Sequence, residues 1–212
     1  MNYAIITGDI IASSKLSPSN RLTFITFLEG FLKQLDKEFN SRSEVYRGDS
    51  FQLSVSDISQ ALRLALICKM FVRSFRFERI VASYPLDARI AIGIGKVDIL
   101  GKKLGVSSGE AFEASGKLLD GMKSKKLSIA VKTNDSFQLE LETSFYLLDT
   151  IISRTTALQC EVIFHKLFER TEHEIAGLLK IKQSAVNQRS RHGDWNAIAM
   201  LLKRFEKIYA VV

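Results

Sequence analysis

The chain has 212 residues, of which 46% are hydrophobic and 25% charged, with 14 Phe and only 2 Pro. This composition excludes an intrinsically disordered chain and supports one large domain or two domains of about 100 residues each. The net charge of +7 suits polyanionic partners such as nucleic acid or nucleotide phosphates but identifies neither. Apolar runs are far shorter than the roughly 20 residues of a membrane helix, and no signal-peptide pattern is present, so we expect a cytoplasmic protein without a membrane partner.

The first 131 residues alternate between segments of strand and helix character. Strands are predicted where β-type residues cluster or alternate with polar ones, and helices where apolar residues recur at three- and four-residue steps. The predicted elements are strand Tyr3–Thr7, helix Ser19–Phe39, strands Glu44–Arg47 and Phe51–Val55, helix Ile58–Phe75, strand Leu86–Ile94, helix Ser108–Met122 and strand Leu127–Val131. The opening βαββαβ order matches the split β-α-β unit. We therefore expect an α+β, ferredoxin-like domain over residues 1–135, with a mostly antiparallel sheet and its helices on one face.

The predicted helix Ile58–Phe75 begins after Asp57, a residue that can cap it. Its apolar residues form two stripes rather than one, so the helix needs two packing partners. One partner is the sheet. The other is either a second copy of the chain or a deep core within one chain. If it is a second copy, the protein is a homodimer, and this is the oligomeric state that we expect.

After about residue 135 the strand signals stop. Five helices are predicted in succession, at Leu141–Ile152, Ala157–Phe168, Glu172–Leu179, Gln183–His192 and Trp195–Ile208. The class change predicts a second, all-α domain over residues 136–212.

Residues 171–193 of this helical part resemble a bacterial helix-turn-helix. Thr171 and Glu174 have the spacing of a capping box. Ala176 offers the small residue that lets two helices cross closely, Ile181 fills the turn, and Val186 anchors the second helix. The segment departs from the common pattern at Lys180, where glycine is usual, and at Arg189, where a buried apolar residue is usual.

If Val186 faces inward, the second helix turns a set of hydrogen-bonding side chains outward. Such side chains can read base edges in the major groove of DNA. The candidate DNA-binding residues are Gln183, Ser184, Asn187, Gln188 and Arg191. The alternative is an antiparallel helix corner that serves packing or dimerisation, with a solvated polar face.

Two aspartates are placed to meet at one end of the predicted sheet. Asp9 directly follows the first strand, and Asp49 lies in the turn of the hairpin, beside Gly48, where glycine permits the positive φ of a tight turn. Converging carboxylates bind Mg²⁺ because it is a hard cation that prefers oxygen ligands. The alternative is that both are ordinary turn residues, since aspartate is common in turns without any metal.

Around these aspartates the chain resembles the palm-type catalytic domain of class III nucleotidyl cyclases, over roughly residues 3–131. The matching segments are ITGDI, YRGDSF, ARIAIGIG and SSGEAFEASGKLL. The resemblance implies a Mg²⁺ site formed by Asp9, Asp49 and the backbone of Ile10. It implies phosphate binding by the loop residues Ala12, Ser13, Ser14 and Lys15.

The same resemblance points to Lys117 as a catalytic residue. In cyclases the helix that corresponds to SSGEAFEASGKLL supplies an Asn and, four residues later, an Arg that stabilises the transition state. The nearest equivalents here are Glu113 and Lys117, and lysine lacks the planar, bidentate donor geometry of arginine. No Lys and Asp pair that would select a purine base stands out.

From ITGDI to the helix-turn-helix, the whole chain resembles the SatD-like family of small bacterial proteins. The helix-turn-helix and the paired aspartates lead to two hypotheses for the function. The leading hypothesis is a DNA-binding transcriptional regulator whose cyclase-like domain senses a nucleotide or metal or dimerises. The alternative is a Mg²⁺-dependent nucleotidyl transferase or cyclase that acts on a nucleoside triphosphate.

Cys68 and Cys160 lie far apart in apolar helical segments, which excludes a disulfide scaffold or a thiolate zinc site.

Overall fold

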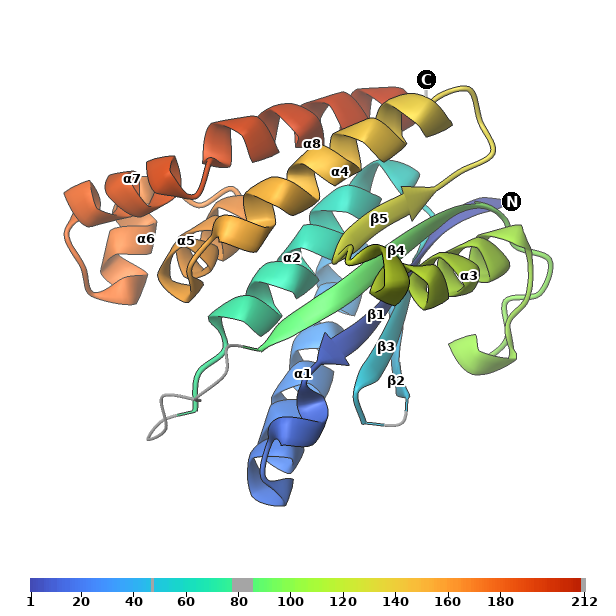
Figure 1. Cartoon of the computed structure of the whole chain (residues 1–212), viewed down its shortest axis with the longest axis horizontal. Helices are drawn as coiled ribbons and strands as arrows, with labels where there is room; N and C mark the ends of the chain where they lie inside the picture. The colour runs from blue at the N-terminus through green and yellow to red at the C-terminus, as the bar shows by residue number, and fades with distance from the viewer. Residues whose placement is uncertain (47, 78–85, 211–212) are drawn as a thin grey trace.

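The computed structural model describes residues 1–46, 48–77 and 86–210. Their elements follow the predicted order (Figure 1). The strands are β1 (Asn2–Ile11), β2 (Arg42–Tyr46), β3 (Ser50–Val55), β4 (Asp87–Lys96) and β5 (Ile129–Lys132). The α-helices are α1 (Pro18–Phe39), α2 (Ala61–Ser74), α3 (Glu110–Lys125), α4 (Gln138–Arg154), α5 (Ala157–Leu167), α6 (Glu172–Leu179), α7 (Gln183–His192) and α8 (Trp195–Tyr209). Short 3₁₀ turns lie at η1 (Ser13–Lys15), η2 (Ile58–Gln60) and η3 (Leu104–Val106).

The five strands form one sheet in the order β2-β3-β1-β4-β5. All neighbouring pairs are antiparallel except β4 and β5, which are parallel. The first four strands thus have the arrangement of the split β-α-β unit, and β5 extends it beyond β4. This confirms the predicted α+β class and the mostly antiparallel sheet.

Helices cover both faces of the sheet, not one. The hydrophobic cluster that contains Ile6 and Ile92 includes residues of α1 and α2, so these two helices share a face as predicted. On the other face, Thr7 donates a hydrogen bond to Ser115 of α3 at 3.0 Å. A Cβ at Gly93 would lie 2.3 Å from the Ala111 carbonyl oxygen of α3. Since neighbouring residues of a strand point to opposite faces, α3 covers the face away from α1 and α2 (Figure 1). The one-face prediction is therefore wrong for α3.

Strand β1 is longer than predicted and runs through Asp9 to Ile11. Gly8 does not end the strand. It pairs with Phe51 of β3, and a Cβ at this position would lie 2.2 Å from the Phe51 ring. The glycine is required for this close approach rather than for a turn, so Asp9 lies within the strand and not directly after it.

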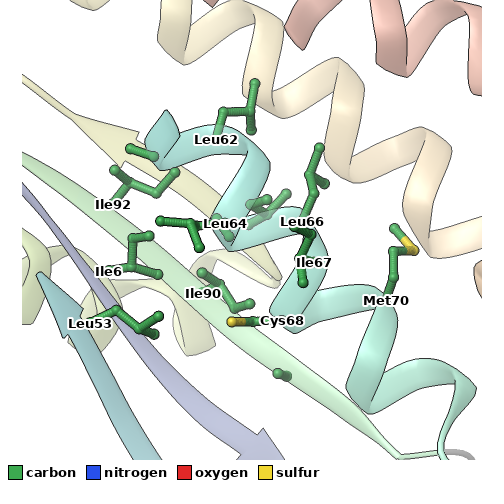
Figure 2. Packing of buried hydrophobic residues seen from close by; sticks show 14 of the residues in the cluster. Ile6, Leu53, Leu62, Leu64, Leu66, Ile67, Cys68, Met70, Ile90 and Ile92 are labelled. Carbon is green, nitrogen blue, oxygen red and sulfur yellow. The ribbon is translucent and has the colours of Figure 1, made fainter. Parts of the chain in front are cut away.

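Helix α2 is buried on both sides by its own chain. Figure 2 shows Leu64 and Cys68 beside Ile6 and Ile90 of the sheet, with Met70 on the other side of the helix. That second side packs against α5. Asp57 caps the preceding turn by accepting a hydrogen bond from the Ser59 backbone at 3.1 Å. Of the two alternatives for the second stripe, the core of a single chain is the correct one, so α2 gives no reason to expect a dimer.

Helices α4, α5 and α8 extend the same hydrophobic cluster. Phe145, Ile163 and Phe205 belong to it together with the α2 residues. A smaller cluster of Val162, Ile175 and Val186 holds α6 and α7 against α5. The predicted boundary at residue 135 marks the end of the sheet, and a shared core joins the parts on either side of it. Among the described residues, no helix combines the length and apolar character needed to cross a membrane.

A buried ionic network connects α2 to the start of β4. The Lys69 side chain is fully buried, and its Nζ lies 2.7 Å from Asp87 Oδ1. Arg73 Nη1 lies 2.8 Å from Asp87 Oδ2, and its Nη2 donates to the Thr155 carbonyl oxygen at 2.7 Å. Burial lowers the pKa of Lys69, and the Asp87 carboxylate opposes that shift. Asp87 therefore compensates two cations that the core has removed from water.

Removal of this carboxylate should destabilise the fold strongly. We expect Asp87→Asn to cost about 3 to 5 kcal/mol, because both cations lose their counter-charge. Lys69→Met should cost clearly less, because Asp87 keeps Arg73 as its partner. Urea unfolding of both variants measures the two losses. A Lys69→Met loss equal to or larger than that of Asp87→Asn would contradict the assigned role of Asp87.

Candidate functional site

A polar row crosses four strands near the end of β1. The pairing register places Tyr46 opposite Ser50, Ser50 opposite Asp9, and Asp9 opposite Arg89. Strand alternation puts Asp9 on the α3 side of the sheet, two residues beyond Thr7. The antiparallel sheet thereby brings together residues from segments that are up to 80 positions apart, as the Asp9–Arg89 ion pair shows.

Asp9 forms an ion pair with Arg89 and is influenced by Asp49. Arg89 Nη1 donates to Asp9 Oδ2 at 3.2 Å, and the two side chains are 22% and 35% exposed, respectively. Burial raises the pKa of Asp9 above its ordinary value of 3.8. Arg89 opposes this shift, and the nearby Asp49 carboxylate adds to it. The two predicted aspartates are therefore electrostatic neighbours, and Asp9 resists ionisation despite its arginine partner.

Asp49 is held from the opposite side, by the segment that follows β1. Ser13 Oγ donates to Asp49 Oδ2 at 3.0 Å, and Arg21 Nη2 of α1 lies 3.6 Å from the same oxygen. Ala12 has a left-handed backbone conformation with φ 63°, which turns the chain at this point. Alanine adopts that conformation only at a cost of roughly 1 to 2 kcal/mol. The turn therefore stores strain directly beside the aspartates.

The other predicted residues of this segment differ in how closely they approach the two aspartates. The Ile10 backbone N–H donates to the Asp49 carbonyl oxygen at 2.8 Å, so Ile10 lies against the hairpin. The Ser14 and Lys15 side chains are exposed. The Lys15 backbone N–H donates to the Ala12 carbonyl oxygen at 2.9 Å, so this N–H is already used within the loop. The loop Ala12–Lys15 thus borders the aspartates, and Ser13 is the member that contacts one of them.

Lys117 is not brought to the aspartates within the chain. Its Nζ lies 2.9 Å from Glu113 Oε2, and both side chains are largely exposed. Lys117 lines a separate groove of about 630 Å³ with Lys132 and Asn134, on the β5 side of α3. Strand β4 lies between β5 and β1 in the sheet. A catalytic role for Lys117 beside Asp9 and Asp49 therefore has no support from its position in a single chain.

Two arginines of the site were not predicted from the sequence. Arg89 lies in the segment ARIAIGIG, where the strand pattern gives no sign that its side chain meets Asp9. Arg21 lies in the first turn of α1, eight residues beyond Ser13. The available signal was strand alternation, which puts Arg89 on the face of β4 opposite to Ile90 and Ile92. Its pairing with Asp9 depends on the strand order, which local patterns do not fix.

The residue types at this end of β1 are ones that could hold a magnesium ion shared with a substrate. Asp9 and Asp49 supply carboxylate oxygens, and Ile10 lies beside them with a backbone carbonyl. No cluster of three or more His, Cys, Asp or Glu residues that could hold a metal occurs within the described ranges. Mg²⁺ commonly takes only one or two protein carboxylates and fills its other positions with water and phosphate oxygens. The cation would also relieve the repulsion between the two carboxylates.

The raised pKa of Asp9, which burial causes first and the Asp49 carboxylate increases, makes stability depend on pH. Because the folded-state pKa of Asp9 is raised, the folded chain holds a proton that the unfolded chain releases, so Asp9 lowers stability as pH rises above 3.8. Asp9→Asn should remove that loss, so the stability of the variant relative to wild type should improve between pH 3 and pH 7. Thermal unfolding over this range, with the exposed Asp120→Asn as control, measures it. A relative stability that falls with rising pH would contradict the account.

A second predicted site lies on α6 and α7. Val186 is fully buried against Ile175 and Val162, as the helix-turn-helix pattern requires. Lys180 ends α6 in a left-handed conformation with φ 54°, so a lysine occupies the geometry for which glycine is usual. Arg189 lies 3.6 Å from Glu161 of α5 and is partly buried by this ion pair. Lys180 thus forms the turn in place of glycine, and Glu161 provides a partner for Arg189, so neither departure prevents the two helices from packing.

The outer side of α7 carries the predicted polar residues. All five candidates are exposed: Gln183, Ser184, Asn187, Gln188 and Arg191. Asn187 Nδ2 is 3.4 Å from Glu172 Oε1 of α6. Trp195 packs against the main hydrophobic cluster. The surface is polar and accessible, which both the DNA-binding and the packing alternatives allow.

No protein-family model matches the chain, and no curated protein matches it, so the SatD-like resemblance stays a prediction. Solved structures that are similar to part of this chain include nucleotidyl cyclases. A bacterial light-regulated adenylyl cyclase is 18% identical, with 62% of this chain and 43% of that chain covered and a TM-score of 0.49. The guanylyl cyclase Cya2 is 19% identical, with 67% and 78% covered and a TM-score of 0.45.

A third similar structure is the dimeric guanylyl cyclase domain of the RhoGC fusion protein from the aquatic fungus Blastocladiella emersonii. It is 16% identical, with 56% of this chain and 73% of that chain covered and a TM-score of 0.45. The chain spans less than half of the light-regulated cyclase. At these identities and scores, the similarity does not assign a chemical activity to this chain.

Proposed function

We propose that the chain binds a nucleoside triphosphate together with Mg²⁺ at the end of β1 and acts on it as a nucleotidyl cyclase or transferase. The observation that supports this most is the meeting of Asp9 and Asp49 at one end of the sheet, each beside an arginine. This reading was the alternative in the sequence analysis, and the site favours it over the regulator hypothesis.

The chain's own residues have distinct parts in such a site. Asp9 and Asp49 would hold the cation, which when bound supplies positive charge to the phosphate oxygens. Arg89 and Arg21 would be released from their carboxylate partners as the cation takes over the neutralisation. Their planar guanidinium groups could then bind phosphate oxygens in a bidentate manner. Ser13, which donates to Asp49, would fix the orientation of that carboxylate.

The test is turnover of each nucleoside triphosphate by the purified full chain with Mg²⁺ or Mn²⁺. We expect a cyclic or transferred nucleotide product from wild type. Asp9→Asn and Asp49→Asn should each lower the rate by at least about 100-fold, equivalent to about 2.7 kcal/mol of lost transition-state stabilisation. The control is Asp120→Asn, an exposed acid of α3, which should retain the wild-type rate.

A parallel thermal-shift measurement separates catalysis from binding. A ligand that binds only the folded chain at 100 times its Kd adds about 2.7 kcal/mol to the unfolding free energy. Stabilisation by nucleotide and Mn²⁺ that both aspartate variants lose, without product, would reduce the proposal to a sensor. Neither product nor stabilisation with any nucleotide would end it.

We keep DNA binding by α7 as a second candidate function. The observation in its favour is the buried Val186 anchor combined with an exposed outer face that carries Gln183, Gln188 and Arg191. Amide and guanidinium groups on a helix can read base edges in a major groove.

Salt-dependent binding to genomic DNA fragments tests this second function. Arg191→Ala should weaken binding to a preferred fragment, and if Arg191 contacts a phosphate, the slope of log K against log salt should fall by about 1. Lys33→Ala, an exposed basic residue of α1, is the control and should leave the slope unchanged. Equal and weak binding of wild type and Arg191→Ala to all fragments would favour the packing alternative.

A further inference from the structure

Helix α4 carries large apolar side chains on its outer surface. Leu139, Tyr146 and Leu147 are 77%, 63% and 60% exposed. The inner side of the same helix is buried in the core through Leu141, Phe145, Leu148 and Ile152. Together with Thr143 and Thr150, the exposed residues recur at three- and four-residue steps, so they form one stripe along the helix. We call these five residues the outer α4 stripe.

The neighbouring helix α8 extends this surface. Arg204 of α8 binds Glu140 of α4 through two hydrogen bonds of 2.7 and 3.0 Å, and Phe145 lies 6.3 Å from Phe205 between ring centroids. Figure 1 shows the two helices side by side on the outside of the molecule. Met200 of α8 is 75% exposed. A group of exposed large apolar residues on adjacent helices is typical of an interaction surface, whereas single exposed residues are ordinary.

The two ends of the outer α4 stripe carry opposite charges. Glu142 lies near its beginning, is exposed, and accepts a 3.3 Å hydrogen bond from Gln138. Arg154 lies in the last turn and is exposed. Within the residues that the structure covers, Arg154 makes no ion pair. The stripe between these charges contains no ionisable group other than the Tyr146 hydroxyl.

We propose that the outer α4 stripe binds a second copy of this chain, with the two α4 helices antiparallel about a two-fold axis beside Leu147. A two-fold interface requires a patch that complements itself, and a stripe with an acid at one end and a base at the other does so only when antiparallel. At about 1.5 Å of rise per residue, the partner's Arg154 lies about 3 Å along the axis from the position opposite Glu142. A parallel arrangement would place like charges together.

The interface is independent of the nucleotide site, because none of its residues contacts Asp9 or Asp49. Sedimentation velocity of the full chain at micromolar concentrations tests it. Wild type should sediment as two chains, and Leu147→Glu should raise the dissociation constant at least about tenfold, because it places a charge on the axis. The matched control is Leu178→Glu on α6, where the leucine is 57% exposed and distant from the stripe in the fold. It should sediment like wild type.

A charge exchange tests the antiparallel register. Glu142→Arg and Arg154→Glu should each weaken the dimer, and the double variant should restore it, since the two charges then pair in reversed order. Circular dichroism melting confirms that each variant is folded. A wild-type chain that sediments as one copy throughout the range would overturn the proposal. So would identical behaviour of the Leu147 and Leu178 variants, or a double variant weaker than both single ones.

Discussion

The burial of α2 between the sheet and the C-terminal helices is the constraint on which the rest of the structure depends. One side of α2 packs on Ile6 and Ile90, and the other side packs on α5. Lys69 and Arg73 lie on this doubly buried helix, and the Asp87 carboxylate at the start of β4 compensates their charge. Because breaking such a pair is costly, the beginning of β4 is fixed relative to both layers.

This fixed strand positions the candidate site. Arg89 follows Asp87 by two residues on β4, and the antiparallel register sets it opposite Asp9 on β1. The hairpin between β2 and β3 brings Asp49 to the same end, where Ser13 and Arg21 meet it. The two carboxylates repel each other, and a turn with left-handed geometry at Ala12 lies beside them. Such local conflicts are characteristic of functional sites.

The sequence predicted the order of elements because each has a strong local pattern. The bounds of α6 and α7 coincide with the prediction, and the capping box of Thr171 and Glu174 marks the start of α6. The predictions that failed depend on non-local contacts. The first strand was predicted to end at Thr7, whereas it continues to Ile11, and Gly8 within it admits the Phe51 ring. The second stripe of α2 could not be assigned to a partner until α5 was seen against it.

The site was predictable in part for the same reason. Asp9 and Asp49 could be paired because a hairpin beside the first strand was expected. Arg89 was missed because its partner is defined by the strand order β3-β1-β4. Lys117 was assigned by resemblance, and strand order again decides its position, on the β5 side of α3. Local patterns thus identify residue types that can do chemistry, and only topology determines which of them meet.

The central claim is that Asp9 and Asp49 jointly bind a divalent cation together with a nucleoside triphosphate. The most direct measurement is a crystal structure with Mn²⁺ and a non-hydrolysable triphosphate, in which anomalous scattering locates the metal. The account predicts a peak within coordination distance of both carboxylates, with Arg89 and Arg21 turned to the phosphates. Intact Asp9–Arg89 and Asp49–Arg21 ion pairs, with the metal elsewhere or absent, would contradict it.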